Sequence, residues 1–377
     1  MNSNPLLIPL VDLVAQYHSI KVEMDEAIQG VIESGHFIGG EPVKQFAQQF
    51  ASYCNTPYCV PNANGTDAIE IALTCMGVGK GDEVIIPAFT FFATIEAVWN
   101  VGATPVLCDI DKFRYTMDPY KAISLVTPAT KVIMPVHLYG QMTDMDPLVL
   151  YALDNNILII EDAAQAHGAT YKGQKAGSIG DINTFSFYPA KNIGAYGDAG
   201  ALTTKSKFLY EKALKMANHG RLTKYDHDSL GRNSRMDTLQ AAILSVKLKH
   251  NEVWTVKRRE IASRYRSLLG GVEQIKLPFE YADSPSVYHL YVIRVNAAIR
   301  DDFRKFMEDK GIETGVHYPV SLSKLKATTD IMKIQANCPE SELASQEVVS
   351  LPIYPELNTE KQDYICEQII AFFKKSN

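Results

Sequence analysis

Short apolar runs alternate with helical stretches between residues 60 and 205. Runs typical of strands lie at 83–87, 104–109, 131–136, 157–160, 184–188 and 201–204, and 92–101 has the pattern of a helix. Runs that are apolar throughout, such as 157–160, are typical of strands covered on both faces. The pattern therefore predicts an α/β domain with a mostly parallel sheet, on which ligands bind beyond the carboxyl ends of the strands.

The pattern changes near residue 237. The segment from Asp237 to about Leu268 has apolar residues at helical spacing and predicts a long helix that leads out of the first domain. Beyond it, we expect strands at 288–295 and 315–318 and helices at 301–310 and 360–374. The chain of 377 residues is long enough for two domains. We therefore expect a large domain over residues 1–245 and a smaller α+β domain over residues 246–377.

Composition and charge exclude several classes of protein. The net charge is -6 and no basic stripe is present, which argues against nucleic-acid binding. The most apolar long segment, 84–107, contains two prolines, Glu96 and Asn100, so we expect no membrane span. None of the six cysteines forms a C-x-x-C pair, so we expect no metal site. No basic segment precedes the N-terminal apolar run, which predicts a cytoplasmic protein without a signal peptide and with reduced thiols.

One lysine lies in an unusual context. In the segment TFSFYPAKNIGAYGDAG, residues 184–200, Lys191 follows a predicted strand and several aromatic residues and lies in a loop rich in small residues. A lysine on a solvated loop is one interpretation. The other is a desolvated lysine, whose lowered pKa gives a neutral amine able to attack an aldehyde.

A carboxylate about thirty residues earlier favours the second interpretation. In IIEDAAQAHG, residues 159–168, Asp162 directly follows a buried strand. A pyridoxal cofactor needs a carboxylate at its pyridine nitrogen, because the protonated ring withdraws electrons from the carbon that carries the amino group. The alternative for Asp162 is a helix N-cap.

A third segment, NANGTDAIEIAL at residues 62–73, predicts a loop that opens a helix. Backbone N–H groups at such a start, with a threonine hydroxyl beside them, form a phosphate cradle. By itself this motif is weak, because it is also a plausible loop and cap. The run GVGKGD at 77–82 precedes a strand, so it is a turn and no dinucleotide-binding motif.

Together, these segments resemble the DegT/DnrJ/EryC1/StrS family of sugar aminotransferases, which have the aspartate aminotransferase fold (fold type I). The resemblance covers nearly the whole chain. Its motifs, in order, are GHFIGGEPV, GTDAIEIAL, GDEVIIPAFTFFAT, HLYGQMTDMD, IEDAAQAHGA, FSFYPAKNIGAYGDAG, GRNSRMDTLQAA, VHYP and SLPIYP.

The resemblance assigns a role to each matching residue, with pyridoxal 5′-phosphate as the cofactor. Lys191 corresponds to the lysine that holds the cofactor, and Asp162 to the partner of its pyridine nitrogen. The other predicted contacts are Gln165 near the ring hydroxyl, Phe91 stacked on the ring, Gly65, Thr66 and Ser186 at the phosphate, and Asn233 at the phosphate of the neighbouring subunit. His317 and Tyr318 resemble substrate-side residues, although packing within a β-strand explains them equally well. A helix cap remains the alternative for Asn233.

The resemblance also implies the partners and the reaction. L-Glutamate donates its amino group and leaves as 2-oxoglutarate, and a nucleotide-linked keto-sugar then receives the group. Lys191 moves the proton between the donor's α-carbon and the cofactor. A homodimer is the smallest active unit that this arrangement allows.

Several alternatives stay open. The motifs GTDA, HLYGQ and NSRMDTLQAA resemble enzymes for 3-keto more than for 4-keto sugars. The sugar is either a 3-keto uronic acid on UDP, with Arg235 facing its carboxylate, or a dTDP-linked 3-keto-6-deoxyhexose. A regulatory protein of the same fold would be expected to lack Lys191 or Asp162, and a dehydratase of this fold has histidine in place of the lysine.

Overall fold

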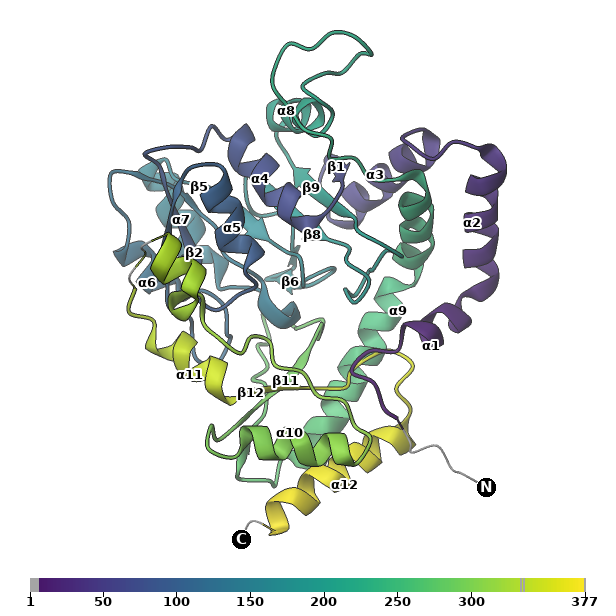
Figure 1. Ribbon diagram of the computed structural model, residues 1–377, viewed down its shortest axis with the longest axis vertical. Coiled ribbons are helices and arrows are strands. Elements are labelled where there is room, and N and C mark those ends of the chain that lie inside the picture. Colours follow the sequence, from purple (N-terminus) through teal and green to yellow (C-terminus); the bar gives the residue numbers. More distant parts are fainter. Residues whose placement is uncertain (1–6, 333, 335, 376–377) are drawn as a thin grey trace.

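A seven-stranded sheet forms the centre of the larger part of the molecule (Figure 1). The structure, a computed structural model, describes residues 7–332, 334 and 336–375. The strands lie in the order β1-β9-β8-β5-β4-β2-β3, with the bounds Tyr58–Asn62 (β1), Gly200–Thr204 (β9), Ile182–Ser186 (β8), Leu158–Asp162 (β5), Thr130–Ile133 (β4), Glu83–Pro87 (β2) and Thr104–Cys108 (β3).

The sheet is mostly parallel, as predicted. The pairs β3–β2, β2–β4, β4–β5 and β5–β8 are parallel, whereas β9 runs antiparallel to both of its neighbours. A two-residue hairpin of Thr170–Tyr171 (β6) and Gln174–Lys175 (β7) lies outside this sheet. The carboxyl ends of β5 and β8 therefore meet at one edge of the sheet, and the residues that follow them lie close together.

Helices cover both faces of this sheet. Alternate side chains along the strands enter two separate cores, so that Ile85, Ile133 and Ile159 lie in one and Val84 and Ile160 in the other. Glu41–Tyr53 (α3), Pro119–Ser124 (α6), Met145–Asn155 (α7) and the start of Thr238–Leu269 (α9) cover the first face. Gly65–Cys75 (α4), Ala93–Asn100 (α5) and Lys207–Ala217 (α8) cover the second. Burial on both faces explains why these strands are apolar throughout.

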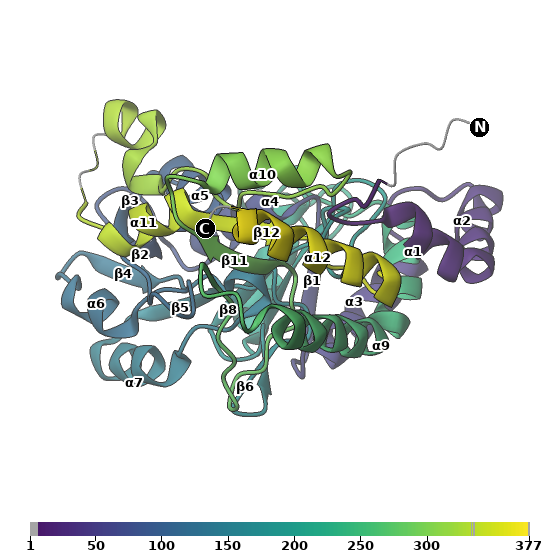
Figure 2. The ribbon, with the colours of Figure 1, turned by 90° about the horizontal axis from the view of Figure 1, so that it is seen from below.

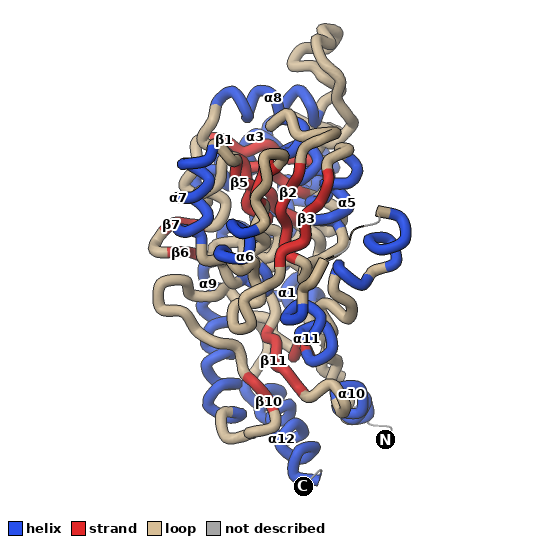
Figure 3. Tube along the Cα trace, turned by 90° about the vertical axis from the view of Figure 1, so that its left-hand side faces the viewer, coloured by secondary structure: helices blue, strands red, loops and turns tan. Residues whose placement is uncertain are grey.

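A smaller α+β unit packs against the second half of the long helix α9 (Figures 2 and 3). Its antiparallel sheet has the order β10-β11-β12, with the bounds Ile275–Lys276, Tyr291–Val295 and Val348–Leu351. The same unit contains three helices, with the bounds Arg300–Asp309 (α10), Pro339–Glu347 (α11) and Thr359–Lys375 (α12). Leu13–Ser19 (α1) and Lys21–Ser34 (α2) precede α3 along the chain, and α2 packs on α9.

The predicted boundary at residue 245 falls inside α9, so the division into 1–245 and 246–377 stays a proposal. The first described residues belong to the smaller unit, since Ile8 pairs with Ile312 and is buried in the same core as Tyr265 and Phe303. Sequence pattern alone does not show this contact between Ile8 and a core formed by residues beyond 260.

The predicted strand at 315–318 is wrong. Gly315 forms only an isolated bridge to Ser350, and the chain then turns over the ends of the large sheet. The carbonyl of His317 accepts a hydrogen bond from the hydroxyl of Tyr139. The His317 carbonyl is thus bonded to the Tyr139 side chain of the larger unit and not to a neighbouring strand. His317 and Tyr318 do not lie in a strand, so packing within a β-strand does not explain them.

Within the described residues, no helix is both long and apolar enough to cross a membrane. In the same part of the chain, no group of three or more potential metal-binding side chains is found. Residues 1–6, on which the signal-peptide prediction partly rests, lie outside the described residues. All six cysteines are buried and unpaired, which agrees with the absence of any C-x-x-C motif.

Candidate active site

A cavity of about 580 Å³ opens at the carboxyl ends of β5 and β8. This volume suits a small cofactor with part of its substrate. Nine of the eleven predicted site residues line the cavity, although they come from segments far apart in the sequence: Gly65, Thr66, Phe91, Asp162, Gln165, Ser186, Lys191, His317 and Tyr318. Asn233 and Arg235 do not line it.

Asp162 is the last residue of β5 and is only 4% exposed. Its Oδ1 accepts a hydrogen bond from the Ala164 N–H at 3.2 Å, and its Oδ2 accepts one from the Thr94 hydroxyl at 3.2 Å. No helix begins after Asp162, so the N-cap interpretation is wrong. Burial raises the pKa of this carboxyl, while the hydrogen bonds and the charge of Lys191 oppose the rise. A cation in the cavity would stabilise the ionised form.

Lys191 lies on a compact loop after β8 and faces the same cavity. The loop folds back on itself through a hydrogen bond from the Ala195 N–H to the Phe187 carbonyl at 2.7 Å. A Cβ at Gly194 would lie 2.1 Å from the carbonyl oxygen of Pro189, so only glycine fits there. Burial lowers the pKa of Lys191 to about 8, although the charge of Asp162 partly opposes this. Lys191 therefore lines the cavity in a desolvated environment, unlike a lysine on a solvated loop.

The start of α4 forms a cradle for an anion. Asn64 caps the helix by accepting the Asp67 N–H at 2.8 Å, and the helix begins at Gly65. A Cβ at Gly65 would lie 2.7 Å from the Cβ of Ser186, so glycine is needed for the two segments to approach. The hydroxyls of Thr66 and Ser186 thus flank a helix N-terminus, where negative charge is favoured.

Gln165 lines the cavity and bonds to two segments of the protein, one containing Tyr139 and the other containing Tyr318. Its Oε1 accepts the Tyr139 N–H at 2.8 Å, and its Nε2 donates to the Tyr318 hydroxyl at 3.0 Å. The exposed ring of Phe91 lies 5.8 Å from the Tyr318 ring. His317 pairs through Nδ1 with the Ser350 hydroxyl at 2.9 Å, and burial lowers its pKa to about 4.

The sequence interpretation missed two residues of this site, Thr94 and His289, and a buried carboxylate outside the cavity lining. Thr94 follows Phe91 in the run AFTFFAT, and a hydroxyl one helical turn after Thr90 was a usable signal. His289 lines the cavity from the smaller unit, and no local pattern marks it. Glu161, next to Asp162, is fully buried and paired with His137 at 2.9 Å.

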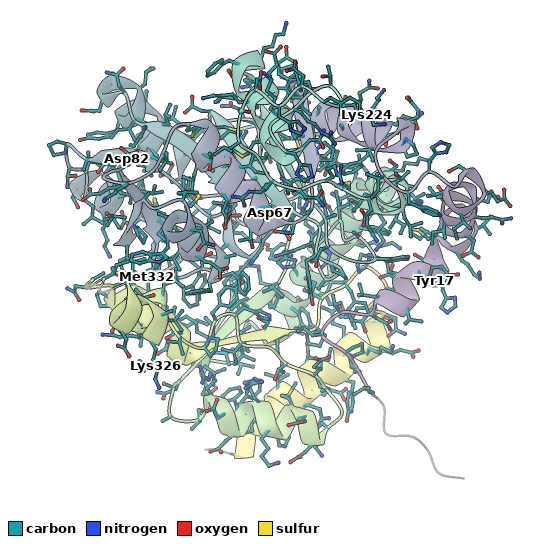
Figure 4. The ribbon with its side chains drawn as sticks, turned by 45° about the horizontal axis from the view of Figure 1, so that its top comes forward. Tyr17, Asp67, Asp82, Lys224, Lys326 and Met332 are labelled. Atoms are coloured by element: carbon teal, nitrogen blue, oxygen red, sulfur yellow. The ribbon has the colours of Figure 1, made fainter. Side chains whose placement is uncertain are left out.

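Asn233 and Arg235 belong to the segment between α8 and α9, which projects as a loop at the top of Figure 1. Asn233 pairs with Asn218, the residue after α8, and therefore lies where this loop returns to the larger unit. Arg232 forms ion pairs with Glu70 and with Asp67, the residue labelled on α4 in Figure 4. The Ser234 hydroxyl accepts the Ala63 N–H at 3.3 Å. Residues 232 and 234 thus face their own chain, whereas Asn233 is exposed.

Asn233 does not cap the long helix. Helix α9 begins at Thr238 and its N-cap position is Asp237, so that alternative is wrong. Arg235 is half-buried, and its Nη1 donates a hydrogen bond to the side-chain Oδ1 of Asn218 at 3.4 Å.

Comparison with known proteins agrees with this geometry. A model of the DegT/DnrJ/EryC1/StrS aminotransferase family matches residues 18–370. The chain belongs to this family. The match spans both units of the fold and every predicted site residue, so the protein is an aminotransferase of the DegT/DnrJ/EryC1/StrS type.

Three curated relatives of this family member cover almost the whole chain. A "pleiotropic regulatory protein" of Geobacillus stearothermophilus is 42% identical over 97% of this chain and 99% of its own. A dTDP-3-amino-3,4,6-trideoxy-alpha-D-glucose transaminase of Streptomyces venezuelae is 39% identical over 93% and 92%. A UDP-2-acetamido-2-deoxy-3-oxo-D-glucuronate aminotransferase of Pseudomonas aeruginosa is 40% identical over 96% and 99%.

Solved structures of the family share the fold. The S. venezuelae DesV structure, in complex with a ketimine intermediate, has a TM-score of 0.95 at 38% identity, over 98% of this chain and 99% of that chain. The Bacillus subtilis NtdA structure, with bound cofactor PMP, has a TM-score of 0.91 at 33% identity, over 99% and 86%. These values confirm the aspartate aminotransferase fold.

Aminotransferases of this family depend on pyridoxal 5′-phosphate, and the residues of this cavity fit that cofactor. The cofactor has an aldehyde, a pyridine nitrogen and a phosphate. The cavity offers an amine of lowered pKa at Lys191, a buried carboxylate at Asp162 and a helix N-terminus at Gly65. Each of the three groups has a chemically matched partner.

Proposed function

We propose that this protein transfers the amino group of L-glutamate to the 3-keto group of a nucleotide-linked sugar. The observation that carries the proposal is the convergence of Lys191 and Asp162 on one cavity of a DegT/DnrJ/EryC1/StrS family member. The names of two relatives support position 3, because one makes a 3-amino sugar on dTDP and the other acts on a 3-oxo sugar on UDP. The product is an amino sugar for a surface polysaccharide or another glycoconjugate.

We assign the cofactor contacts as follows. Lys191 holds the cofactor and, once displaced by the amino donor, carries the proton from the donor's α-carbon. Its lowered pKa suits this task, because a larger fraction of the amine is neutral at physiological pH. Asp162 faces the pyridine nitrogen, and the bound cofactor supplies an electron-withdrawing ring. Gly65, Thr66 and Ser186 hold the phosphate, and Phe91 and Gln165 contact the ring.

The active site is proposed to be shared between two chains of a homodimer. Asn233 lies outside its own cavity and is exposed, while its neighbours Arg232 and Ser234 bond to their own chain. Successive side chains of an extended segment point to opposite sides. Asn233 is therefore directed away from its own chain, as a residue that reaches a partner's phosphate must be.

The identity of the sugar is the finer part of the proposal. Arg235 lies on the same segment as Asn233, so a partner chain would bring both residues to the same site. If Arg235 faces the substrate, a uronic acid on UDP is favoured, because a guanidinium pairs well with a carboxylate. A dTDP-linked 3-keto-6-deoxyhexose is the second candidate, and a 4-keto sugar is the third.

A substrate panel tests the function. Purified protein with pyridoxal phosphate and L-glutamate is offered 3-keto and 4-keto sugars on UDP and dTDP, and 2-oxoglutarate and the amino sugar are measured by mass spectrometry. We expect turnover of a 3-keto sugar and little of its 4-keto isomer. Preference for the 4-keto isomer would overturn the position of amination.

A regulatory function is the alternative that the name of the G. stearothermophilus relative suggests. Both Lys191 and Asp162 are present and line one cavity, which favours catalysis. Formation of 2-oxoglutarate from L-glutamate with any keto-sugar in the panel would exclude a purely regulatory protein.

We also propose a cytoplasmic location, because the six cysteines are free. Fractionation of cells that express the protein would test this.

A further inference from the structure

The residue after Lys191 is held by the smaller unit. The Asn192 side-chain Nδ2 donates to the Val287 carbonyl at 3.2 Å, and its Oδ1 lies 3.2 Å from Nδ1 of His289. The amide nitrogen is already a donor to a carbonyl, so the amide oxygen must be the atom that faces the ring. His289 therefore donates through an Nδ1–H. Both side chains are buried, at 3% and 8% exposure.

The segment that carries His289 is itself fixed on two sides. The Val287 N–H donates to the Gly140 carbonyl of the larger unit at 3.0 Å, and Arg258 in the second half of α9 donates to the Tyr288 carbonyl at 3.1 Å. A Cβ at Gly140 would lie 2.8 Å from Cγ2 of Val287 and 2.9 Å from the backbone nitrogen of His289. The two segments approach so closely that His289 has little freedom to move away from Asn192.

The electrostatic surroundings keep the His289 ring neutral. Burial lowers the pKa of His289 well below its ordinary value, and the charges of Lys191 and Arg258 act in the same direction, as do the neighbouring rings of His317 and His167. A neutral ring can hold Asn192 without placing a second positive charge beside the Lys191 amine.

We propose that His289 is a positioning residue for Lys191: acting through Asn192, it fixes the backbone of the lysine loop relative to the cavity. The inference rests on the proposed role of Lys191. Proton transfer requires the amine to lie within hydrogen-bond reach of the donor's α-carbon, and a displacement of about 1 Å costs roughly a hundredfold in rate. The smaller unit thereby takes part in placing the amine that the larger unit carries.

The test uses the holoenzyme and the half-reaction with L-glutamate, followed by the cofactor's absorbance in single turnovers. His289→Ala and Asn192→Ala should each slow this step at least tenfold at saturating glutamate, with little change in the apparent affinity for glutamate. The double variant should be no slower than Asn192→Ala, because that variant already removes the contact with His289 as well as the bond to Val287. His289→Asn, which restores a donor near the Nδ1 position, should recover most of the rate.

A second readout separates positioning from general stability. The pH at which the absorbance of the lysine-linked cofactor changes should shift in His289→Ala and Asn192→Ala. The matched control is Asn251→Ala, which removes another buried asparagine, bonded to the Tyr53 hydroxyl at 2.7 Å and outside the cavity lining. Asn251→Ala should lower the melting temperature without slowing the half-reaction or shifting the absorbance.

Two results would overturn the inference. One is a wild-type half-reaction rate in folded Asn192→Ala or His289→Ala, and the other is strictly additive losses in the double variant. Failure of the proposed function is recognised separately: borohydride reduction of the wild-type holoenzyme followed by peptide mapping would then label a lysine other than Lys191. If His289→Ala does not fold, Asn192→Ala tests the same bond from the other side.

Discussion

The hydroxyl of Thr94 donates a hydrogen bond to Oδ2 of Asp162 at 3.2 Å, across 68 residues of sequence. Both residues are buried, Thr94 in the first turn of α5 and Asp162 at the end of β5. With the Ala164 N–H on the other oxygen, two donors orient the carboxylate that we assign to the pyridine nitrogen. A carboxylate fixed in this way is preorganised for a cationic partner.

Asp162→Asn should keep the fold and lower the glutamate half-reaction rate by at least a hundredfold, because the amide cannot stabilise a protonated pyridine nitrogen. Thr94→Val, which removes one neutral hydrogen bond, should cost about tenfold, equivalent to about 1.4 kcal/mol. Single-turnover absorbance measures both rates, and circular dichroism checks the fold. Near-normal turnover of Asp162→Asn would show that another group holds the nitrogen.

Lys191 should become reactive at a lower pH than an ordinary lysine. Burial disfavours its charged form, so the amine loses its proton near pH 8 instead of near 10.4. Competitive labelling of the cofactor-free protein with an amine reagent, followed by mass spectrometry, measures this midpoint. The exposed Lys207 serves as the internal control. Equal midpoints for the two lysines would contradict the desolvation of Lys191.

Mixed dimers should recover activity from two inactive parents. Under the proposed roles, Lys191→Ala cannot hold the cofactor, and Asn233→Asp places a negative charge against the partner's phosphate. In a mixed dimer, one site combines the intact lysine of one chain with the intact asparagine of the other, while the second site carries both defects. Activity should return to about half of the wild-type value per dimer, if the sites are independent.

The mixing experiment needs both parents folded and the mixed species isolated with two different affinity tags. Absence of rescue under those conditions would place Asn233 in the site of its own chain or in none.

Arg235→Ala should distinguish the two candidate sugars. If Arg235 pairs with a sugar carboxylate, the change costs about 2 kcal/mol or more in kcat/KM for the uronic acid and much less for a 6-deoxy sugar. Steady-state kinetics with both substrates measure the difference. A wild-type preference for the 6-deoxy sugar would exclude the uronic acid as the natural substrate.

Glu161→Gln should destabilise the fold by about 3 kcal/mol. Burial opposes ionisation of Glu161, but the hydrogen bond to His137 and the N–H groups of Gly177 and Gly180 outweigh it and lower its pKa. Because the pKa is lowered on folding, this stabilisation is present above pH 4.5 and is lost as the pH falls. Urea denaturation at pH 7 and pH 4 measures both effects, and Glu211→Gln on the surface should change neither. A change below 1 kcal/mol would contradict the prediction.

The sequence by itself determined the strands of the parallel sheet and the long helix α9. Their signals are local. Apolar runs such as 157–160 are typical of strands buried on both faces, and the apolar residues at helical spacing from Asp237 onward form one stripe along a helix. The motifs around Lys191, Asp162 and Gly65 likewise identified the chemistry of the cofactor, because an amine, a carboxylate and a helix N-terminus each occur in a short segment that the sequence shows directly.

Only the tertiary structure decided which distant side chains complete the site. Thr94 reaches Asp162, and His289 reaches Asn192, through contacts between segments that share no local pattern. The course of residues 315–318 was misjudged for the same reason, since pairing with β12 stops at Gly315 and two later residues bond to Tyr139 and Gln165 of the larger unit. Local spacing determines which face of an element is buried, whereas the partner on that face depends on how the whole chain packs.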